Sequence, residues 1–112
     1  MLISLFSGPS PSLLVSDRYD IRKLSINGLH TTLVHETRSV SAIAVDVRNK
    51  WIYWADSALK KIFKAHIGSS SEPIVIADVG KPEGLALDYS SGKLYWTDAG
   101  ECSGLKDCPI FL

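Results

Sequence analysis

One internal repeat constrains the fold of this 112-residue chain more than any other sequence feature. The segment YWAD at residues 53–56 recurs as YWTD at residues 95–98, an offset of 42 residues. The segments before them recur at the same offset, with IAVD at 43–46 and LALD at 85–88, and LVSD at 14–17 holds the corresponding place in a partial first copy. A period of about 40–45 residues made of short strands is typical of the blades of a β-propeller.

Short strands are expected along the whole of this repeat. Segments rich in β-branched and aromatic residues alternate with turn signals such as Asn27-Gly28 and Ser91-Gly92. The expected strands are 13–17, 21–26, 31–35, 42–47, 51–55, 62–67, 74–77, 84–88 and 93–97. Helical periodicity is weak, and only residues 57–65 are compatible with a short helix. The sequence therefore predicts an all-β fold.

The repeated motif strand carries an unbroken apolar run instead of an alternating pattern. Ile52, Tyr53 and Trp54 follow one another directly, which indicates a strand that is buried on both faces. Because adjacent side chains of a strand point in opposite directions, Ile52 and Trp54 should face one neighbouring blade and Tyr53 the other. A strand of a β-sandwich would show the same run, but it would not explain the 42-residue offset.

These motifs resemble the YWTD repeat of the low-density lipoprotein receptor class B family. Residues 95–98 spell the motif itself, and PEGLALD at 82–88 and IAVD at 43–46 are similar to the lead-in of that repeat. Residues 13–22 (LLVSDRYDIR) resemble the opening of these propellers, so the resemblance covers about residues 11–100. It implies a β-propeller of YWTD type, built from four-stranded antiparallel blades, in an extracellular protein.

The resemblance also implies a six-bladed ring, which at this period needs about 250 residues. The chain is therefore expected to hold the N-terminal portion of an incomplete propeller, about two to two and a half blades. The expected parts are an apolar extension with Pro and Gly (1–10), a partial first copy (11–41), a repeat (42–83), a truncated repeat (84–99) and a divergent C-terminal tail (100–112).

The conspicuous side chains of the repeat are expected to be structural. Asp56 ends its strand, where a carboxylate can accept backbone N–H groups, and Asp46 precedes a turn, where Asp bonds the backbone ahead of it. Trp and Tyr of the motif bring large apolar areas between blades. Because each residue recurs once per blade, the copies do not converge on one centre. The predicted structural set is Tyr53, Trp54, Asp56, Tyr95, Trp96, Thr97, Asp98, Asp46 and Asp88.

Motifs for chemistry are absent from the sequence. It has no serine elbow, no H-E-x-x-H motif and no phosphate loop, and its histidines (His30, His35, His66) show no metal-ligand spacing. The sequence therefore predicts no catalytic residue, no metal site and no cofactor. Cys102 and Cys108 are separated by five residues, which is compatible equally with a small disulfide loop and with two free thiols.

Charge and hydropathy limit the partners of this chain. Its 12 basic and 12 acidic residues balance, which argues against nucleic acid and anionic lipid as partners. The apolar start, Met1–Phe6, is shorter than the core of a signal peptide, and no run reaches the roughly 18 apolar residues of a membrane span. We therefore expect no signal peptide, no anchor and no direct membrane contact in this chain, although the resemblance implies the extracellular part of a membrane receptor.

Three functions are compatible with these features. The resemblance implies a non-enzymatic protein-binding module of a receptor related to the low-density lipoprotein receptor, with a role in ligand binding, endocytosis or co-receptor signalling. An alternative is a propeller of a matrix or adhesion protein of the basement-membrane-linker type. A propeller enzyme such as a metal-dependent lactonase would need buried carboxylates that converge from non-equivalent positions, and the sequence shows no such set.

Binding is expected through the loops of one propeller face, because loops on a rigid scaffold carry function. Relatives that bind short Asn-containing peptides use acidic and aromatic residues near these loops, whereas this chain has Lys60 and Lys61 there. The lysines are compatible with an acidic ligand and equally with ordinary solvated loops. The predicted partner-binding residues are Arg18, Tyr19, Arg38, Lys60 and Lys61. We also expect the chain to associate through an exposed blade edge and apolar face.

Overall fold

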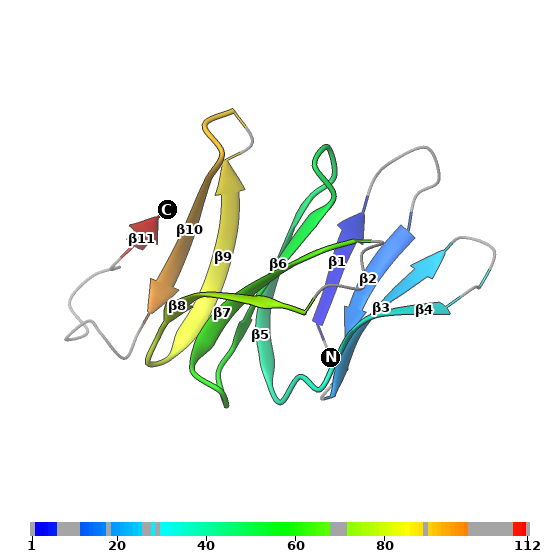
Figure 1. Cartoon of the computed structure of the whole chain (residues 1–112), viewed down its shortest axis with the longest axis horizontal. Coiled ribbons are helices and arrows are strands. Elements are labelled where there is room, and N and C mark those ends of the chain that lie inside the picture. The colour runs from blue at the N-terminus through cyan, green and yellow to red at the C-terminus, as the bar shows by residue number, and fades with distance from the viewer. Residues whose placement is uncertain are drawn as a thin grey trace.

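The computed structural model describes residues 2–6, 12–17, 19–25, 28, 30–67, 72–88, 90–98 and 109–111. These residues form three antiparallel β-sheets that lie side by side (Figure 1), and none of them belongs to a helix. The all-β prediction is therefore confirmed.

Each sheet is a run of strands that are consecutive in the sequence. The first sheet has the order β1 (Leu2–Phe6), β2 (Ser12–Ser16), β3 (Asp20–Ser25) and β4 (His30–His35). The second has the order β5 (Val40–Asp46), β6 (Trp51–Asp56), β7 (Lys61–His66) and β8 (Ile74–Asp78). The third has the order β9 (Pro82–Asp88), β10 (Lys93–Asp98) and β11 (Pro109–Phe111).

Two strands lie where the sequence predicted none. Residues 2–6, expected within an N-terminal extension, form β1 and pair with β2 from Leu2 opposite Ser16 to Phe6 opposite Ser12. Residues 109–111, expected within a divergent tail, form β11 against β10. Each strand occupies a place that the second sheet also fills, β1 that of β5 and β11 that of β7. Each satisfies the backbone groups of a motif strand that would otherwise form an open edge.

The segment at residues 57–65 is not a helix, so the helical alternative is wrong. Residues 57–60 form a turn, and β7 follows, paired with β6 on one side and β8 on the other. Ile62 is completely buried. Hydrogen bonds to two neighbouring strands and the burial of this side chain outweigh the weak helical pattern of the segment.

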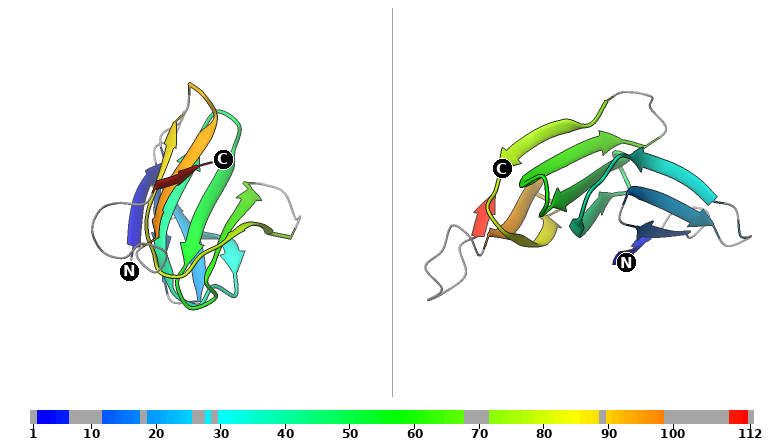
Figure 2. Two further views of the ribbon diagram at one scale, coloured as in Figure 1. Left: turned by 90° about the vertical axis from the view of Figure 1, so that its left-hand side faces the viewer. Right: turned by 90° about the horizontal axis from the view of Figure 1, so that it is seen from below.

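The core lies between successive sheets. Ile52 and Trp54 of β6 pack with Ile21 and Val34 of the first sheet, whereas Tyr53 packs against the cluster between the second and third sheets. The motif strand is therefore covered on both faces, and its side chains divide as the strand alternation predicts. Seen from below, the sheets follow one another along an arc (Figure 2), with β1, β5 and β9 as neighbouring inner strands.

The connections between strands gather at two opposite ends of the sheets (Figure 1). We call one of them the loop end, which comprises residues 17, 19, 36–39, 57–60 and 79–81. The other is the hairpin end, which comprises the turn residues 47–50 and 90–92.

Candidate functional site

The loop end is organised around a buried carboxylate at the end of β6. Asp56 is 0% exposed, and it accepts hydrogen bonds from the backbone N–H groups of Arg38 (2.8 Å, to Oδ2) and Ser39 (3.1 Å, to Oδ1). Its Oδ1 also accepts from the backbone N–H groups of Ala58 (3.0 Å) and Leu59 (3.1 Å). This carboxylate therefore joins the connection that arrives from the first sheet to the turn that follows β6.

The next copy of the motif repeats this arrangement. Asp98 is 1% exposed, and its two carboxylate oxygens accept the backbone N–H groups of Gly80 and Lys81, both at 2.7 Å. Gly80 and Lys81 follow Arg38 and Ser39 by the same 42-residue offset. Each aspartate thus holds the connection that leads from the preceding sheet into its own sheet.

Backbone hydrogen bonds link these connections further. Thr37 N–H donates to the carbonyl of Tyr19 (3.0 Å), and Val79 N–H donates to the carbonyl of Lys60 (3.0 Å). A buried ionised carboxylate is costly unless it is hydrogen-bonded, and charge-assisted bonds from backbone N–H groups supply that compensation. The loop end is therefore a chain of mutually bonded connections with fixed positions.

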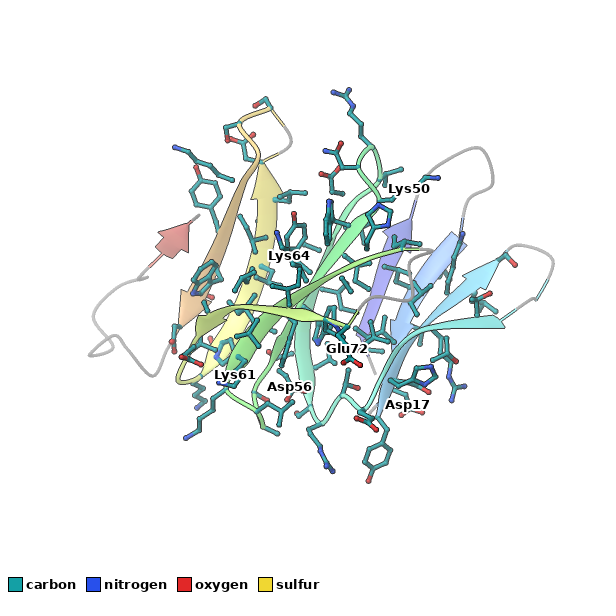
Figure 3. The ribbon with its side chains drawn as sticks, viewed as in Figure 1. Asp17, Lys50, Asp56, Lys61, Lys64 and Glu72 are labelled. Carbon is teal, nitrogen blue, oxygen red and sulfur yellow. The ribbon has the colours of Figure 1, made fainter. Side chains whose placement is uncertain are left out.

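The loop end brings together part of the predicted partner-binding set. Tyr19 is 60% exposed, and Arg38 and Lys60 are exposed on the two connections that follow. Lys61 lies beside them but pairs with Asp78, with 2.6 Å between Nζ and Oδ1. Figure 3 shows Asp56 and Lys61 at this end of the ribbon. Arg18 lies outside the described residues.

Lys81 is a loop-end cation that the sequence reasoning missed. It is exposed on the connection between β8 and β9, next to Asp98, which binds its backbone N–H. Its position corresponds to Ser39 at the 42-residue offset, and that correspondence is the signal that could have found it.

The aspartates at the hairpin end stabilise turns. Asp46 accepts hydrogen bonds from the backbone N–H (3.1 Å) and the side-chain amide (2.9 Å) of Asn49. Asp88 accepts from the hydroxyls of Ser90 (2.8 Å) and Ser91 (2.7 Å) and from the backbone N–H of Ser90 (3.1 Å). The hydroxyl donors lower the pKa of Asp88, that of Ser91 most strongly.

A cavity of about 620 Å³ lies between these two turns, at a place that the sequence reasoning did not consider. It is lined by residues 46–49, Tyr53, Leu87, Asp88 and Gly92. Burial, together with the nearby charge of Asp46, raises the pKa of Tyr53. Since the turns are copies of each other, the repeat already implied that they share one end of the sheets.

The aromatic motif residues lie between sheets. The ring of Trp54 stacks on Phe63, with centroids 5.4 Å apart and planes 17° from parallel. Trp96 is 3% exposed and packs toward the second sheet, and no hydrogen-bond partner reaches its Nε1. Tyr95 and Thr97 are half-buried on the other face of β10. The structural role of the motif residues stays a prediction, which substitutions at these positions can test.

Other predicted features concern metals, cysteines and membranes. In the described ranges, no three His, Cys, Asp or Glu side chains gather in a way that could hold a metal ion. Cys102 and Cys108 lie outside these ranges, so their pairing stays a prediction. Among the residues that the structure describes, no helix could cross a membrane.

Comparison with known proteins identifies the repeat. Residues 50–89 match the family model of the low-density lipoprotein receptor repeat class B. The chain is 32% identical over 100 residues to low-density lipoprotein receptor-related protein 8 of Homo sapiens, which covers 84% of this chain and 10% of the relative. It is 33% identical over 93 residues to nidogen of Drosophila melanogaster, which covers 82% of this chain and 7% of the relative. The chain thus spans about a tenth or less of the length of these curated relatives.

The arrangement of the sheets also matches a solved structure. A chain in the crystal structure of a nidogen/laminin complex is similar with a TM-score of 0.71 at 24% identity, over 88% of this chain and 43% of that chain. This likeness shows the fold, so the three sheets are blades of an incomplete β-propeller of YWTD type. With the repeated motif, the family model and the fold in agreement, the chain belongs to the low-density lipoprotein receptor class B (YWTD) repeat family.

Proposed function

We propose that this chain is a protein-binding segment of an extracellular receptor and that its loop end contacts the partner. The similarity to low-density lipoprotein receptor-related protein 8 supports the receptor assignment. Endocytic uptake or co-receptor signalling would follow from this binding step.

The observation that carries the proposal is a set of three exposed cations on fixed connections. Arg38, Lys60 and Lys81 are exposed, and none of them forms an ion pair with another described residue. Their backbones are held by Asp56, by Val79 N–H and by Asp98, respectively. Because the backbone of these connections is already held in place, binding needs to order only the side chains of the three cations.

The charge at the loop end favours an acidic protein segment over a polyanion. Asp17 and Glu36 are also exposed at this end, so the surface alternates in sign instead of forming one basic field. A nucleic acid backbone requires a continuous basic surface. A protein segment that carries Asp or Glu at intervals suits separated cations, and exposed Tyr19 adds an aromatic contact.

A peptide-display experiment tests this assignment. Random peptides selected on the immobilised wild-type chain should be enriched in Asp and Glu, and their binding should weaken with salt. They should lose binding to the Arg38→Glu/Lys60→Glu double variant and keep it with the Arg48→Glu/Lys50→Glu double variant, which makes the same charge change at two exposed positions of the hairpin end. Equal binding to the wild type and the double variant would place the binding surface elsewhere.

We further propose that the module acts without enzymatic chemistry. The carboxylates of Asp56 and Asp98 already accept backbone N–H groups, and those of Asp46 and Asp88 accept turn donors. Each is therefore engaged in holding the chain, which supports a binding role over a hydrolytic one.

A matrix protein is the second candidate, and the nidogen relative favours it at similar identity and coverage. The two candidates differ in where the native protein resides. An antibody raised against the 112-residue chain should detect the protein in washed membranes if it is a receptor. Detection in the culture medium and deposited matrix alone would instead support the matrix candidate.

A further inference from the structure

A cavity of about 210 Å³ lies between the first and second sheets, beside the loop end. It is lined by residues 34–37, 54, 56, 59, 63, 72 and 73. We call it the outer cavity, because β4 is the outermost strand of the first sheet and residues 72–73 lead into β8, the outermost strand of the second. Both of these sheets have four strands, so the outer cavity does not lie at either end of the series of sheets.

One wall of the outer cavity is apolar. The rings of Trp54 and Phe63 are stacked, with centroids 5.4 Å apart, and Val34 of the first sheet packs with them. Leu59, in the turn after β6, adds a side chain that is 40% exposed. Apolar walls that open to water suit the methylene stem of a long side chain whose polar end stays solvated.

Two carboxylates stand at the outer cavity without a partner. Glu36 follows β4 and Glu72 precedes β8, and both side chains are exposed. Neither forms an ion pair or a side-chain hydrogen bond with another described residue. In Figure 3, Glu72 lies between the second sheet and the first. The two negative charges are therefore available to a ligand.

Glu36 is an extra residue relative to the repeat. β4 ends at His35 and β8 ends at Asp78. Thr37 and Val79 are equivalent, since each donates its backbone N–H to the carbonyl just before the third strand of its sheet. The first sheet thus has one more residue before this bond, and Glu36 occupies it with a φ of 65°. A carboxylate that the repeat does not need, in a disfavoured backbone conformation, points to a role other than folding.

Size and donor set limit what the outer cavity can hold. In the part of the chain that the structure describes, no three His, Cys, Asp or Glu side chains gather closely enough to hold a metal ion. Its volume of about 210 Å³ is below the roughly 300–1,000 Å³ of pockets that hold a whole small ligand. Its lining contains no lysine or arginine that could neutralise the two glutamates. One long cationic side chain fits these limits.

We propose that the outer cavity binds a lysine or arginine side chain of a protein partner. The alkyl stem packs on Trp54 and Phe63, and the charged end is attracted by Glu36 and Glu72. Because both carboxylates are exposed, the interaction is modest by itself and weakens with salt. The site has the opposite charge to the loop-end cations, so it does not depend on the acidic segment proposed for them.

A nuclear magnetic resonance titration of the isotope-labelled whole chain tests the proposal. The probes are N-acetyl-arginine amide and N-acetyl-lysine amide, added at low ionic strength. The chain has three tryptophans, and the indole N–H signal assigned to Trp54 should shift with both probes. N-acetyl-citrulline amide is the uncharged analogue of the arginine probe, and it should bind at least about tenfold more weakly.

Conservative variants identify the carboxylates that bind the probe. Glu36→Gln and Glu72→Gln each remove one charge and keep the size of the side chain. Each should weaken binding of the arginine probe by about threefold, and the double variant by about tenfold, because exposed ion pairs are individually modest. Glu83→Gln is the matched control, since Glu83 is exposed on β9 outside the cavity, and it should bind as the wild type does.

Several results would overturn the proposal. They are a Trp54 signal that does not respond to the charged probes, equal binding of the citrulline probe, and unchanged binding by the double glutamine variant. The Arg38→Glu/Lys60→Glu variant should still bind the arginine probe, so failure at the loop end is distinguishable from failure here. The dispersion of the amide signals shows in the same spectra that each variant is folded.

Discussion

At the residue scale, the aspartates of the repeat perform two different tasks. Asp56 and Asp98 are buried and bind connections that lie 17 and 18 residues earlier in the chain. Asp46 and Asp88 are partly exposed and bind the turns that directly follow them. The same side chain therefore serves long-range assembly at one end of the sheets and local turn formation at the other.

We expect Asp56→Ala to lower the free energy of unfolding by about 3 kcal/mol, because it leaves part-buried backbone N–H groups without acceptors. Asp56→Asn keeps one acceptor oxygen and should cost less. Asp46→Ala is the control, and it should cost about 1 kcal/mol because its turn is exposed to water. Urea denaturation measures all three. Equal losses for Asp56→Ala and Asp46→Ala would contradict the role of Asp56 in holding the connection between the first and second sheets.

A second residue-scale prediction concerns backbone strain at the hairpin end. Lys50 has a φ of 60°, and its repeat equivalent is Gly92 with a φ of 71°. A side chain with a Cβ is disfavoured in this left-handed region, whereas glycine adopts it readily. Lys50→Gly should therefore raise the free energy of unfolding by about 0.5–1 kcal/mol. This is the net gain, because the greater conformational freedom of glycine in the unfolded chain offsets part of the relieved strain.

Lys50→Ala separates strain from charge. It removes the same ammonium group but keeps the Cβ, so it should bring no gain in thermal unfolding experiments. A gain of equal size in both variants would show that the side chain, and not the backbone conformation, limits stability at this turn.

At the element scale, the second and third sheets form the same turn and the same strand pairing with different residues. The turn after β5 is held by Asn49, and the turn after β9 is held by Ser90 and Ser91. In the third sheet, β11 takes the place beside β10 that β7 takes beside β6, and Ile110 is opposite Trp96 as Phe63 is opposite Trp54. The pairing geometry is thus kept where the sequence match ends.

The turn after β9 should contribute stability that depends on pH. The pKa of Asp88 is lowered in the folded chain, so its contribution is present above the unfolded pKa of about 4 and is lost as pH falls through the folded pKa. Asp88→Ala should therefore be less stable than the wild type at neutral pH, and the difference should shrink in acid. Thermal melts from neutral to acidic pH measure it, and a difference that does not vary with pH would contradict this account.

At the scale of the whole molecule, the second sheet is the one that has a described neighbouring sheet on each of its two faces. Its residues Ile52 and Trp54 pack on the first sheet, and Ala44 and Ala55 belong to the cluster shared with the third. The first and third sheets are each covered on one face by a described neighbour. Stability is therefore expected to be highest in the middle of the arc.

Hydrogen–deuterium exchange should show this gradient. Backbone amides of β6 should exchange more slowly than those of β2 and β10, because opening β6 disrupts two interfaces and opening either of the others disrupts one. The measurement is made at low concentration to limit self-association. Uniform protection across the three motif strands would mean that the chain unfolds as one unit.

The sequence alone determined the features that depend on local pattern. The 42-residue period, the strands of the repeat and the opposite directions of Trp54 and Tyr53 follow from residue type and strand alternation. It also placed Asp56 at a strand end, where backbone donors are available. These features could be predicted because each is encoded within a few consecutive residues or within an exact repeat of them.

Only the tertiary structure decided which distant groups meet. The donors that Asp56 finds at Arg38 and Ser39 and the cavity between the two turns depend on how one sheet lies against the next. The pairing of Lys61 with Asp78 and the strand β1 depend on which strands pair within one sheet. No local pattern encodes these contacts, since their partners are separated in sequence and are brought together by strand pairing and by packing between sheets. The sequence thus defined the blade, and the packing of blades defined the loop end.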